Sequence, residues 1–183
     1  MKMKSSVKYI SVIFLILSIT SCNRKSHFTS DTRTKFEDWN LSLQKLQYYI
    51  DNDIVLSREI SKDTARIFMG TAIFQDGKYY QNIKLKASTR GICTAVFPDR
   101  LHISFEPTDN KYLVFALPNN SLGSDHTYQL INEDNATPEG IIKYDGNLYK
   151  LFVNKNWPKL MISKKLITKE RYDGRIMKGR KVK

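Results

Sequence analysis

Short apolar runs that alternate with polar residues occupy most of the chain from residue 46 to residue 166. A period of two places successive side chains on opposite faces, which is the pattern of a β-strand with one buried face. Turn-forming residues separate the runs. The pattern predicts strands over residues 46–50, 54–60, 66–74, 79–86, 92–97, 101–105, 111–117, 127–131, 141–144, 147–153 and 159–166.

Two Asp-Gly pairs, Asp76-Gly77 and Asp145-Gly146, lie between such runs. Asp-Gly tolerates the positive φ angles of a type I′ turn, so each pair predicts a tight β-hairpin. Residues 51–53 (Asp-Asn-Asp) also have a composition that predicts a turn. The same residues could ligate calcium, but the glycine and the terminal glutamate of an EF-hand calcium loop are missing, so a turn is the better prediction. Many short strands joined by tight turns predict a mainly β fold, either an antiparallel β-sandwich or an SH3-like barrel.

A short N-terminal helix is predicted over residues 35–46, before the strands. Its apolar residues recur at spacings of three and four, on one helical face: Phe36, Trp39, Leu43 and Leu46. Asp31 or Thr32 would cap this helix at its N-terminus. An extended strand through residues 41–48 fits the same sequence, so both alternatives stay open.

The N-terminal stretch 2–22 has a different pattern. Three lysines precede an apolar run over residues 9–19, and small residues then lead to Cys22. The run has the length of a signal-peptide core and is shorter than the roughly 20 residues that cross a bilayer. This stretch resembles the lipobox signal of bacterial lipoproteins. The resemblance implies cleavage before Cys22 and a diacylglycerol on the Cys22 thiol, with an ordinary cleaved signal peptide as the alternative.

The chain is therefore expected to have four parts: a signal peptide over 1–21, a lipidated N-terminus and tether over 22–34, a single β-rich domain over 35–166 and a basic tail over 167–183. Each buried acyl methylene contributes about 0.8 kcal/mol to membrane binding, so two or more chains anchor a protein stably. We expect Cys22 to hold the mature protein on the bilayer. The lipoprotein resemblance, with basic residues after that cysteine, favours the periplasmic face of the outer membrane.

Positive charge is concentrated at the C-terminal end. The chain has 30 Lys and Arg against 18 Asp and Glu, a formal net charge of +12, and residues 164–183 hold nine basic residues against two acidic ones. For an exported protein, a basic segment attracts anionic lipids, peptidoglycan carboxylates or an acidic protein rather than nucleic acid. A tail that is only solvated is the alternative. The candidate contact residues are Lys169, Arg171, Arg175, Lys178, Arg180 and Lys181.

No residue pattern for catalysis or metal binding stands out. The sequence lacks the nucleophile elbow of hydrolases, the paired histidines of zinc proteases, a phosphate-binding glycine loop and a Cys-x-x-Cys pair. Cys93 lies in an apolar run and is expected to be a buried structural thiol. His102 alternates with Leu101 and Ile103 and is expected to face solvent. We therefore expect a non-enzymatic protein with no metal and no cofactor apart from the lipid on Cys22.

Adjacent tyrosines provide candidate binding residues. In the pairs Tyr48-Tyr49 and Tyr79-Tyr80, strand alternation is expected to place one ring in the core and one outside. An outward tyrosine suits contacts with protein or sugar because it offers apolar area and a hydroxyl. Tyr49 and Tyr80 are the candidates. Covering cross-strand neighbours on an ordinary sheet is the alternative role for each ring.

Two segments, LQYYIDNDIVLSRE and GICTAVFPDRLHISFE, resemble small Bacteroidota envelope lipoproteins, including the TssQ-like lipoproteins encoded with type VI secretion systems. The resemblance covers about residues 46–106 and implies no site residues. Together with the lipobox, it implies a membrane-anchored, periplasm-facing accessory subunit of a secretion-type envelope assembly, with other envelope proteins as partners. The alternative is a module that binds peptidoglycan or another envelope polymer.

Overall fold

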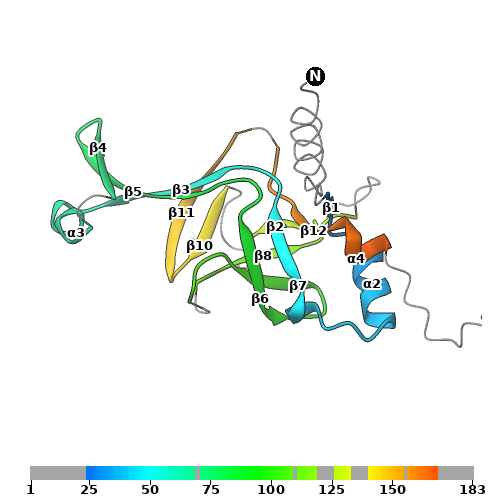
Figure 1. The fold of residues 1–183 in the computed structure, drawn as a ribbon. Helices are drawn as coiled ribbons and strands as arrows, with labels where there is room; N and C mark the ends of the chain where they lie inside the picture. The colour runs from blue at the N-terminus through cyan, green and yellow to red at the C-terminus, as the bar shows by residue number, and fades with distance from the viewer. Residues whose placement is uncertain are drawn as a thin grey trace, which may run out of the picture.

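The computed structural model describes residues 24–68, 71–108, 111–118, 126–132, 140–154 and 156–168. Two antiparallel sheets form a sandwich-like fold with short helices, which confirms the mainly β prediction (Figure 1). The predicted signal peptide, Cys22 and the tail from Lys169 onward lie outside the described residues. No helix in the described ranges is both long enough and apolar enough to cross a membrane.

Within the described residues, the larger sheet has seven strands in the order β1-β12-β2-β6-β7-β8-β9. Each strand pairs antiparallel with its neighbours, and β6, β7 and β8 follow one another as a meander. The bounds are β1 Lys25–His27, β2 Gln47–Ile50, β6 Arg90–Val96, β7 Arg100–Ser104, β8 Tyr112–Ala116, β9 Gln129–Ile131 and β12 Leu160–Ser163.

The smaller sheet has five strands among the described residues, in the order β10-β11-β3-β5-β4. All of its pairs are antiparallel as well. The bounds are β3 Ile54–Ile60, β4 Ala72–Gln75, β5 Lys78–Leu85, β10 Ile141–Tyr144 and β11 Asn147–Val153. The described helices are α2 Ser30–Asp38, the short 3₁₀ helix η2 Leu43–Lys45, α3 Lys62–Ile67 and α4 Lys164–Thr168.

The predicted turn at residues 51–53 is confirmed, and it carries the chain from β2 in one sheet to β3 in the other. Its carboxylates bind backbone amides. Asp51 accepts a 2.7 Å hydrogen bond from the Lys159 N–H, and Asp53 accepts one of 2.7 Å from the Ala87 N–H. These acidic residues thus fix the corner of the sandwich, because each holds a neighbouring segment of the chain.

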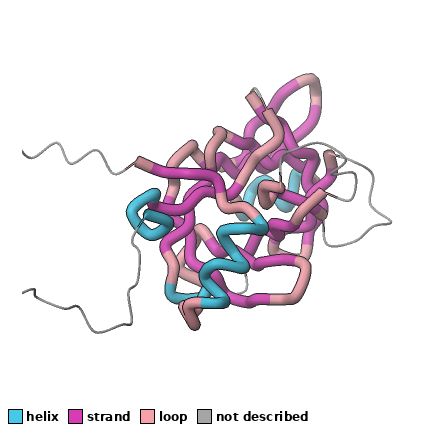
Figure 2. The backbone as a smooth tube through the Cα atoms, turned by 90° about the vertical axis from the view of Figure 1, so that its right-hand side faces the viewer, coloured by secondary structure: helices cyan, strands magenta, loops and turns pink. Residues whose placement is uncertain are grey.

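The centre of the core is aromatic. Phe28, Phe36, Tyr48 and Phe115 are fully buried, and the Phe28 ring lies 5.6 Å from Tyr48 and 5.1 Å from Tyr128, measured between centroids. Each such side chain removes a large apolar area from water, which is the dominant stabilising term. Figure 2 faces the end of the body that carries α2 and shows a helix lying in front of the strands there.

The tether predicted over residues 22–34 is wrong from Lys25 onward. Residues 25–27 form β1, which pairs with β12, and Phe28 is fully buried. Residues 25–27 are all polar, so they show no apolar alternation, and the large apolar residue Phe28 lies just after the strand. The folded domain therefore begins at least ten residues earlier than the predicted boundary at residue 35.

The helix predicted over residues 35–46 is displaced. It runs from Ser30 to Asp38, and its N-cap is Thr29, whose side chain accepts from the Thr32 N–H, rather than Asp31 or Thr32. Asn40, at φ 51°, ends it in the left-handed conformation that asparagine tolerates. A 3₁₀ turn then buries Leu43, so the apolar face was identified while the helix itself is shorter.

Two predicted strands are partly helical. Residues 62–67 form α3, so the strand predicted over 66–74 begins only at Ala72. The strand predicted over 159–166 ends at Ser163 and continues as α4. The other predicted strands agree with the structure to within about two residues at each end, which is the ordinary uncertainty of element boundaries.

His102 is buried, contrary to the prediction that it faces solvent. Its side chain is 6% exposed and stacks on Tyr112 at 4.1 Å between ring centroids, with Phe97 4.7 Å away. Strand β7 is buried on both faces, so alternation does not separate inside from outside there. Cys93 is buried, as predicted, and burial raises the pKa of its thiol to about 11.

The larger sheet approaches closure without reaching it. Tyr128 donates a 2.9 Å backbone hydrogen bond to Phe28 and accepts one of 2.9 Å from Leu160, and isolated bridges join Thr29 to Thr127 and Gln129 to Lys159. These contacts link residues beside β9 to the β1 and β12 end of the sheet. The sheets remain open, so the sandwich alternative is correct and the SH3-like barrel is not.

Candidate functional site

One end of the smaller sheet extends beyond the sandwich as an arm, formed by the described residues of 58–81. Strand β3 pairs with β11 only as far as Ser57, whereas its pairing with β5 continues to Ile60. Beyond that point α3, β4 and the first half of β5 project away from the body (Figure 1). The arm is therefore supported at its base and not along its length.

The local sequence explains why the arm forms. Asp76 and Gly77 have φ angles of 50° and 77°, as a type I′ turn requires, and pair Gln75 with Lys78 across the predicted hairpin. Ser61 caps α3 by accepting a 3.1 Å hydrogen bond from the Thr64 N–H. A strong turn and a capped helical turn thus define the arm from local chemistry.

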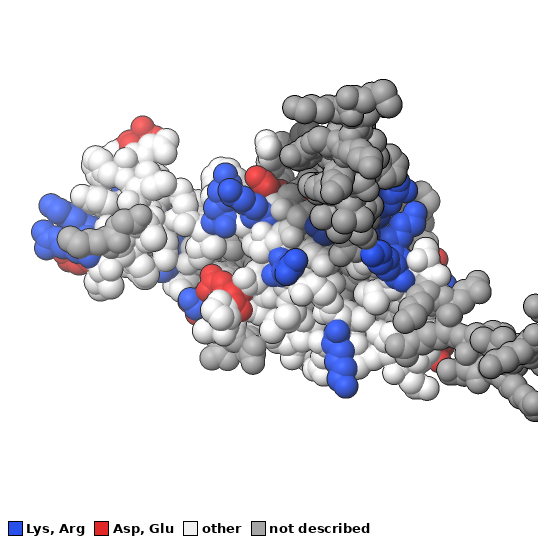
Figure 3. Space-filling model, viewed as in Figure 1, with Lys and Arg blue, Asp and Glu red and all other residues white. Residues whose placement is uncertain are grey.

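Large apolar side chains of the arm are exposed. Ile67 is 80% exposed, Phe74 62% and Ile73 48%. The Phe74 ring lies against its cross-strand partner Tyr79, with centroids 4.8 Å apart. Figure 3 shows the arm as mostly uncharged on the face towards the viewer, with basic residues at the end where α3 lies. Neighbouring exposed apolar residues of this size are typical of an interaction surface.

One face of the arm continues the core face of the sandwich. Leu56 and Ile60 share a face of β3 because they are an even number of residues apart, and Ile60 pairs with Tyr79, which pairs with Phe74. Leu56 is 2% exposed in the core, whereas Phe74 on the same face is largely exposed. The sheet thus carries its apolar face past the region where the second sheet covers it.

A polar network holds the base of the arm. Arg58 donates a 2.8 Å hydrogen bond to the side-chain oxygen of Gln81 and a second one to Asn147, and its guanidinium lies 5.3 Å from the centroid of the Tyr149 ring. The Tyr149 hydroxyl also donates to Gln81, at 3.2 Å. These contacts tie β3 and β5 of the arm to β11 of the body.

Strand β4 has an open edge among the described residues, since β5 is its one partner and it ends the strand order of the smaller sheet. The edge is short, four residues, and it carries Ile73 and Phe74 on opposite faces. Unpaired backbone N–H and C=O groups on such an edge can receive a further strand. The arm therefore combines an open edge with exposed apolar side chains on both faces.

The contact residues predicted from the sequence differ in where they lie. Tyr49 is 8% exposed and lies under the Lys25 ammonium, 4.4 Å from the ring centroid, so both rings of the Tyr48-Tyr49 pair are buried. Tyr80 is half-buried on the arm and pairs with Ile73. The structure therefore brings Tyr80 to the candidate surface and withdraws Tyr49 from solvent. Cys22 and the tail candidates from Lys169 to Lys181 lie outside the described residues.

Sequence reasoning missed Ile67, Ile73 and Phe74, because a continuous strand over 66–74 would have placed Ile67 and Ile73 on one face and Phe74 on the other, so that one face would be buried. The stretch Ser-Lys-Asp-Thr at residues 61–64 was the available signal, since serine with an acidic residue in the first turn marks a helix start. The exposure of Ile67, Ile73 and Phe74 depends on how far the larger sheet extends over the smaller one, and no pattern within the segment indicates that extent.

The described part of the chain has no group of three or more His, Cys, Asp or Glu side chains placed to hold a metal ion. No protein-family model matches the sequence. Neither a curated protein nor a solved structure is significantly similar to it.

Proposed function

We propose that this protein is a lipid-anchored, non-enzymatic accessory subunit of a cell-envelope assembly, and that its arm binds another protein of that assembly. The observation that carries the proposal is the exposure of Ile67, Ile73 and Phe74 on a projecting part of the sheet. Burying such side chains against a partner contributes about 25 cal/mol per Å² of apolar area. The arm offers that area without opening the core.

The open edge of β4 favours a protein partner over a bilayer. Within hydrocarbon every backbone N–H and C=O must be satisfied internally, so open sheet edges are not found there. A protein can instead add a strand to the edge and place alternate side chains against Ile73 and Phe74. The expected partner therefore supplies an extended segment with apolar side chains.

The position of the arm suits an anchored adaptor. Strand β1 begins at Lys25, three residues after the proposed lipidation site Cys22, and Figure 1 shows β1 and the arm at opposite ends of the molecule. With the lipid at one end, the arm would point away from that membrane. A partner would then be met at a distance from the anchor, as an accessory subunit of a larger assembly requires.

We further propose that the assembly is of the secretion type and that the protein lies on the periplasmic face of the outer membrane. Its support is the resemblance of residues 46–106 to lipoproteins encoded with type VI secretion systems, and of residues 2–22 to lipobox signals. The arm supports the binding of a partner protein and does not by itself identify the assembly.

Co-purification of the full-length protein from detergent-solubilised membranes tests the proposal. The wild type should bring down defined envelope proteins, and the double variant Ile73→Ser/Phe74→Ser should lose them while keeping the thermal midpoint within a few degrees. Ile92→Ser is the matched control, because Ile92 is 50% exposed on β6 of the larger sheet. A wild-type protein that purifies alone, or an arm variant that keeps every partner, would contradict the proposal. Binding to lipid vesicles that requires Ile73 and Phe74 would indicate a membrane-inserting arm instead.

A further inference from the structure

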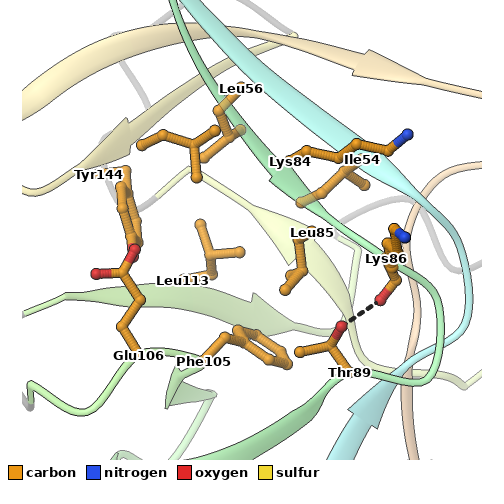
Figure 4. A pocket seen from close by; sticks show the side chains of 11 residues that line it. Ile54, Leu56, Lys84, Leu85, Lys86, Thr89, Phe105, Glu106, Leu113 and Tyr144 are labelled. Carbon is orange, nitrogen blue, oxygen red and sulfur yellow. Dashed lines mark hydrogen bonds between the residues drawn. The ribbon is translucent and has the colours of Figure 1, made fainter. Parts of the chain in front are cut away.

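A cavity of about 400 Å³ lies between the two sheets, next to the corner where the chain passes from β5 to β6. Its lining is mostly aliphatic and aromatic (Figure 4). The lining comes from β3, β5, β8, β10, the turn between β5 and β6, and the residues after β7. The apolar side chains that form its walls are Ile54, Leu56, Ile83, Leu85, Phe105 and Leu113.

The cavity exists because the inner faces of the two sheets do not meet at this corner. Leu56 and Ile83 are cross-strand partners on the inner face of the smaller sheet and both line the cavity. Leu113 faces Leu56 from β8 (Figure 4). Leu56 and Leu113 are almost fully buried, whereas Ile83 and Leu85 remain half-buried. An opening therefore leads from solvent to the buried apolar walls.

The two ends of the cavity differ in charge. Lys86 and Thr89 line one side, and Glu106 and Tyr144 line the opposite side (Figure 4). Lys84 also borders the cavity, but its side chain leaves β5 on the face opposite to Ile83 and Leu85. Glu106 already has partners, since it accepts a hydrogen bond from the Tyr144 hydroxyl and lies 3.5 Å from the Lys111 ammonium, which it shares with Asp145.

The Lys86 side chain, in contrast, is exposed at the rim and makes no ion pair or hydrogen bond with the described residues. Thr89 adds a hydroxyl at the same end, which donates a 2.6 Å hydrogen bond to the Lys86 carbonyl. The rim at this end therefore has a cation without an acidic partner in the described part of the chain.

We propose that this cavity binds a single acyl chain with an anionic head group, such as a fatty acid. The chain would lie along the walls formed by Leu56, Leu85 and Leu113, and the head would lie beside the Lys86 ammonium and the Thr89 hydroxyl. Its volume is near the lower end of the roughly 300–1,000 Å³ that is usual for small-molecule pockets, which suits one chain rather than a lipid with several. This site is separate from the arm and does not depend on the proposed partner.

Photo-crosslinking with a diazirine-bearing myristate tests the site, using the full-length protein held in lipid nanodiscs. Crosslinked peptides identified by mass spectrometry should map to residues 83–89 and 105–113. Unlabelled myristate should compete, and laurate should compete about 15-fold less well, because two methylenes fewer are buried. Tetradecanol should compete less well than myristate in the wild type, and the two should compete equally well in a Lys86→Ala variant.

Two further variants separate binding from folding. Leu85→Phe adds volume at a half-buried wall position and should abolish labelling of the cavity peptides while the thermal midpoint stays within a few degrees. Lys143→Ala removes an exposed lysine of β10 that does not line the cavity, and should leave labelling unchanged. Labelling confined to other peptides, labelling that myristate does not compete, or full labelling of a folded Leu85→Phe variant would each overturn the proposal.

Discussion

Arg33 donates a 2.9 Å hydrogen bond to the hydroxyl of Tyr128, although the two residues lie 95 positions apart in the chain. The same guanidinium donates at 2.8 Å to the Phe97 carbonyl and at 2.8 Å to Glu37. Arg33 is 9% exposed, so it is a buried charge with a partner on each side. It joins α2 to the residue before β9 and to the turn between β6 and β7.

Arg33→Ala should lower the free energy of unfolding by about 2–4 kcal/mol, because it removes three charge-assisted hydrogen bonds and leaves buried acceptors without donors. Urea denaturation followed by circular dichroism measures the change. Glu37→Gln is the control. Its side chain is 50% exposed, so losing this ion pair should cost less than about 1 kcal/mol. Equal losses in the two variants would show that Arg33 has no special role.

Gly91 is required by close packing. A Cβ atom at this position would lie 2.7 Å from Cγ2 of Ile103 and 2.7 Å from Cε1 of Phe105. Because Ile103 is fully buried and cannot move aside, Gly91→Ala should destabilise the fold by about 1–3 kcal/mol. Gly77→Asn is the control, since nothing lies within 4 Å and asparagine tolerates the positive φ. A Gly91→Ala variant of unchanged thermal stability would contradict the packing.

Stability should fall at alkaline pH. Burial raises the pKa of the Tyr48 and Tyr144 hydroxyls, and raises that of the Cys93 thiol to about 11, from ordinary values of 10.0 and 9.0. The unfolded chain therefore releases these protons first. The stabilisation is fully present below about pH 9 and is lost as the pH rises through the folded-state values.

Tyr48→Phe isolates one of these groups. At pH 7 it should cost about 1 kcal/mol, since the Tyr48 hydroxyl donates a 3.0 Å hydrogen bond to the Leu43 carbonyl. It should also make the loss of stability above pH 9 less steep, because one fewer proton is released on unfolding. Denaturation curves between pH 7 and 11 measure both effects, and an unchanged slope would contradict the assignment.

Arg58→Ala should loosen the arm without unfolding the body. The variant removes the hydrogen bonds to Gln81 and Asn147 at the base of the arm. Amide hydrogen exchange should become faster in residues 72–81 and stay unchanged in β7 and β8. Lys78→Ala, which removes an exposed ion pair with Glu59, should leave the exchange pattern as it is. Uniform acceleration throughout the domain would contradict a local role.

The fold class was predictable because most strands obey simple alternation and the two Asp-Gly turns have strong local preferences. Both pairs adopt the expected positive φ angles. Local sequence patterns failed where tertiary packing determines strand formation or the burial of a side chain. Strand β1 is too short and polar to show a pattern, and His102 lies in a strand with two buried faces.

The candidate site was predictable only in part. Tyr80 was identified from its position in a strand, but the exposure of Phe74 follows from pairing between distant segments, because β11 stops pairing with β3 at Ser57. The same applies to Tyr49, which is covered by Lys25 from another strand. Such coverage is a property of tertiary packing, and no spacing within one segment encodes it.

Site-specific photo-crosslinking in membranes tests the central claim most directly. A photoreactive residue placed at Phe74 on the arm should form crosslinks to a discrete envelope protein, and one placed at the 38%-exposed Val96 on the body should not. Crosslinking from position 74 should also disappear when Ile73 is replaced by serine. If position 74 yields only lipid adducts, or no more protein crosslinks than position 96, the arm is not the partner-binding element.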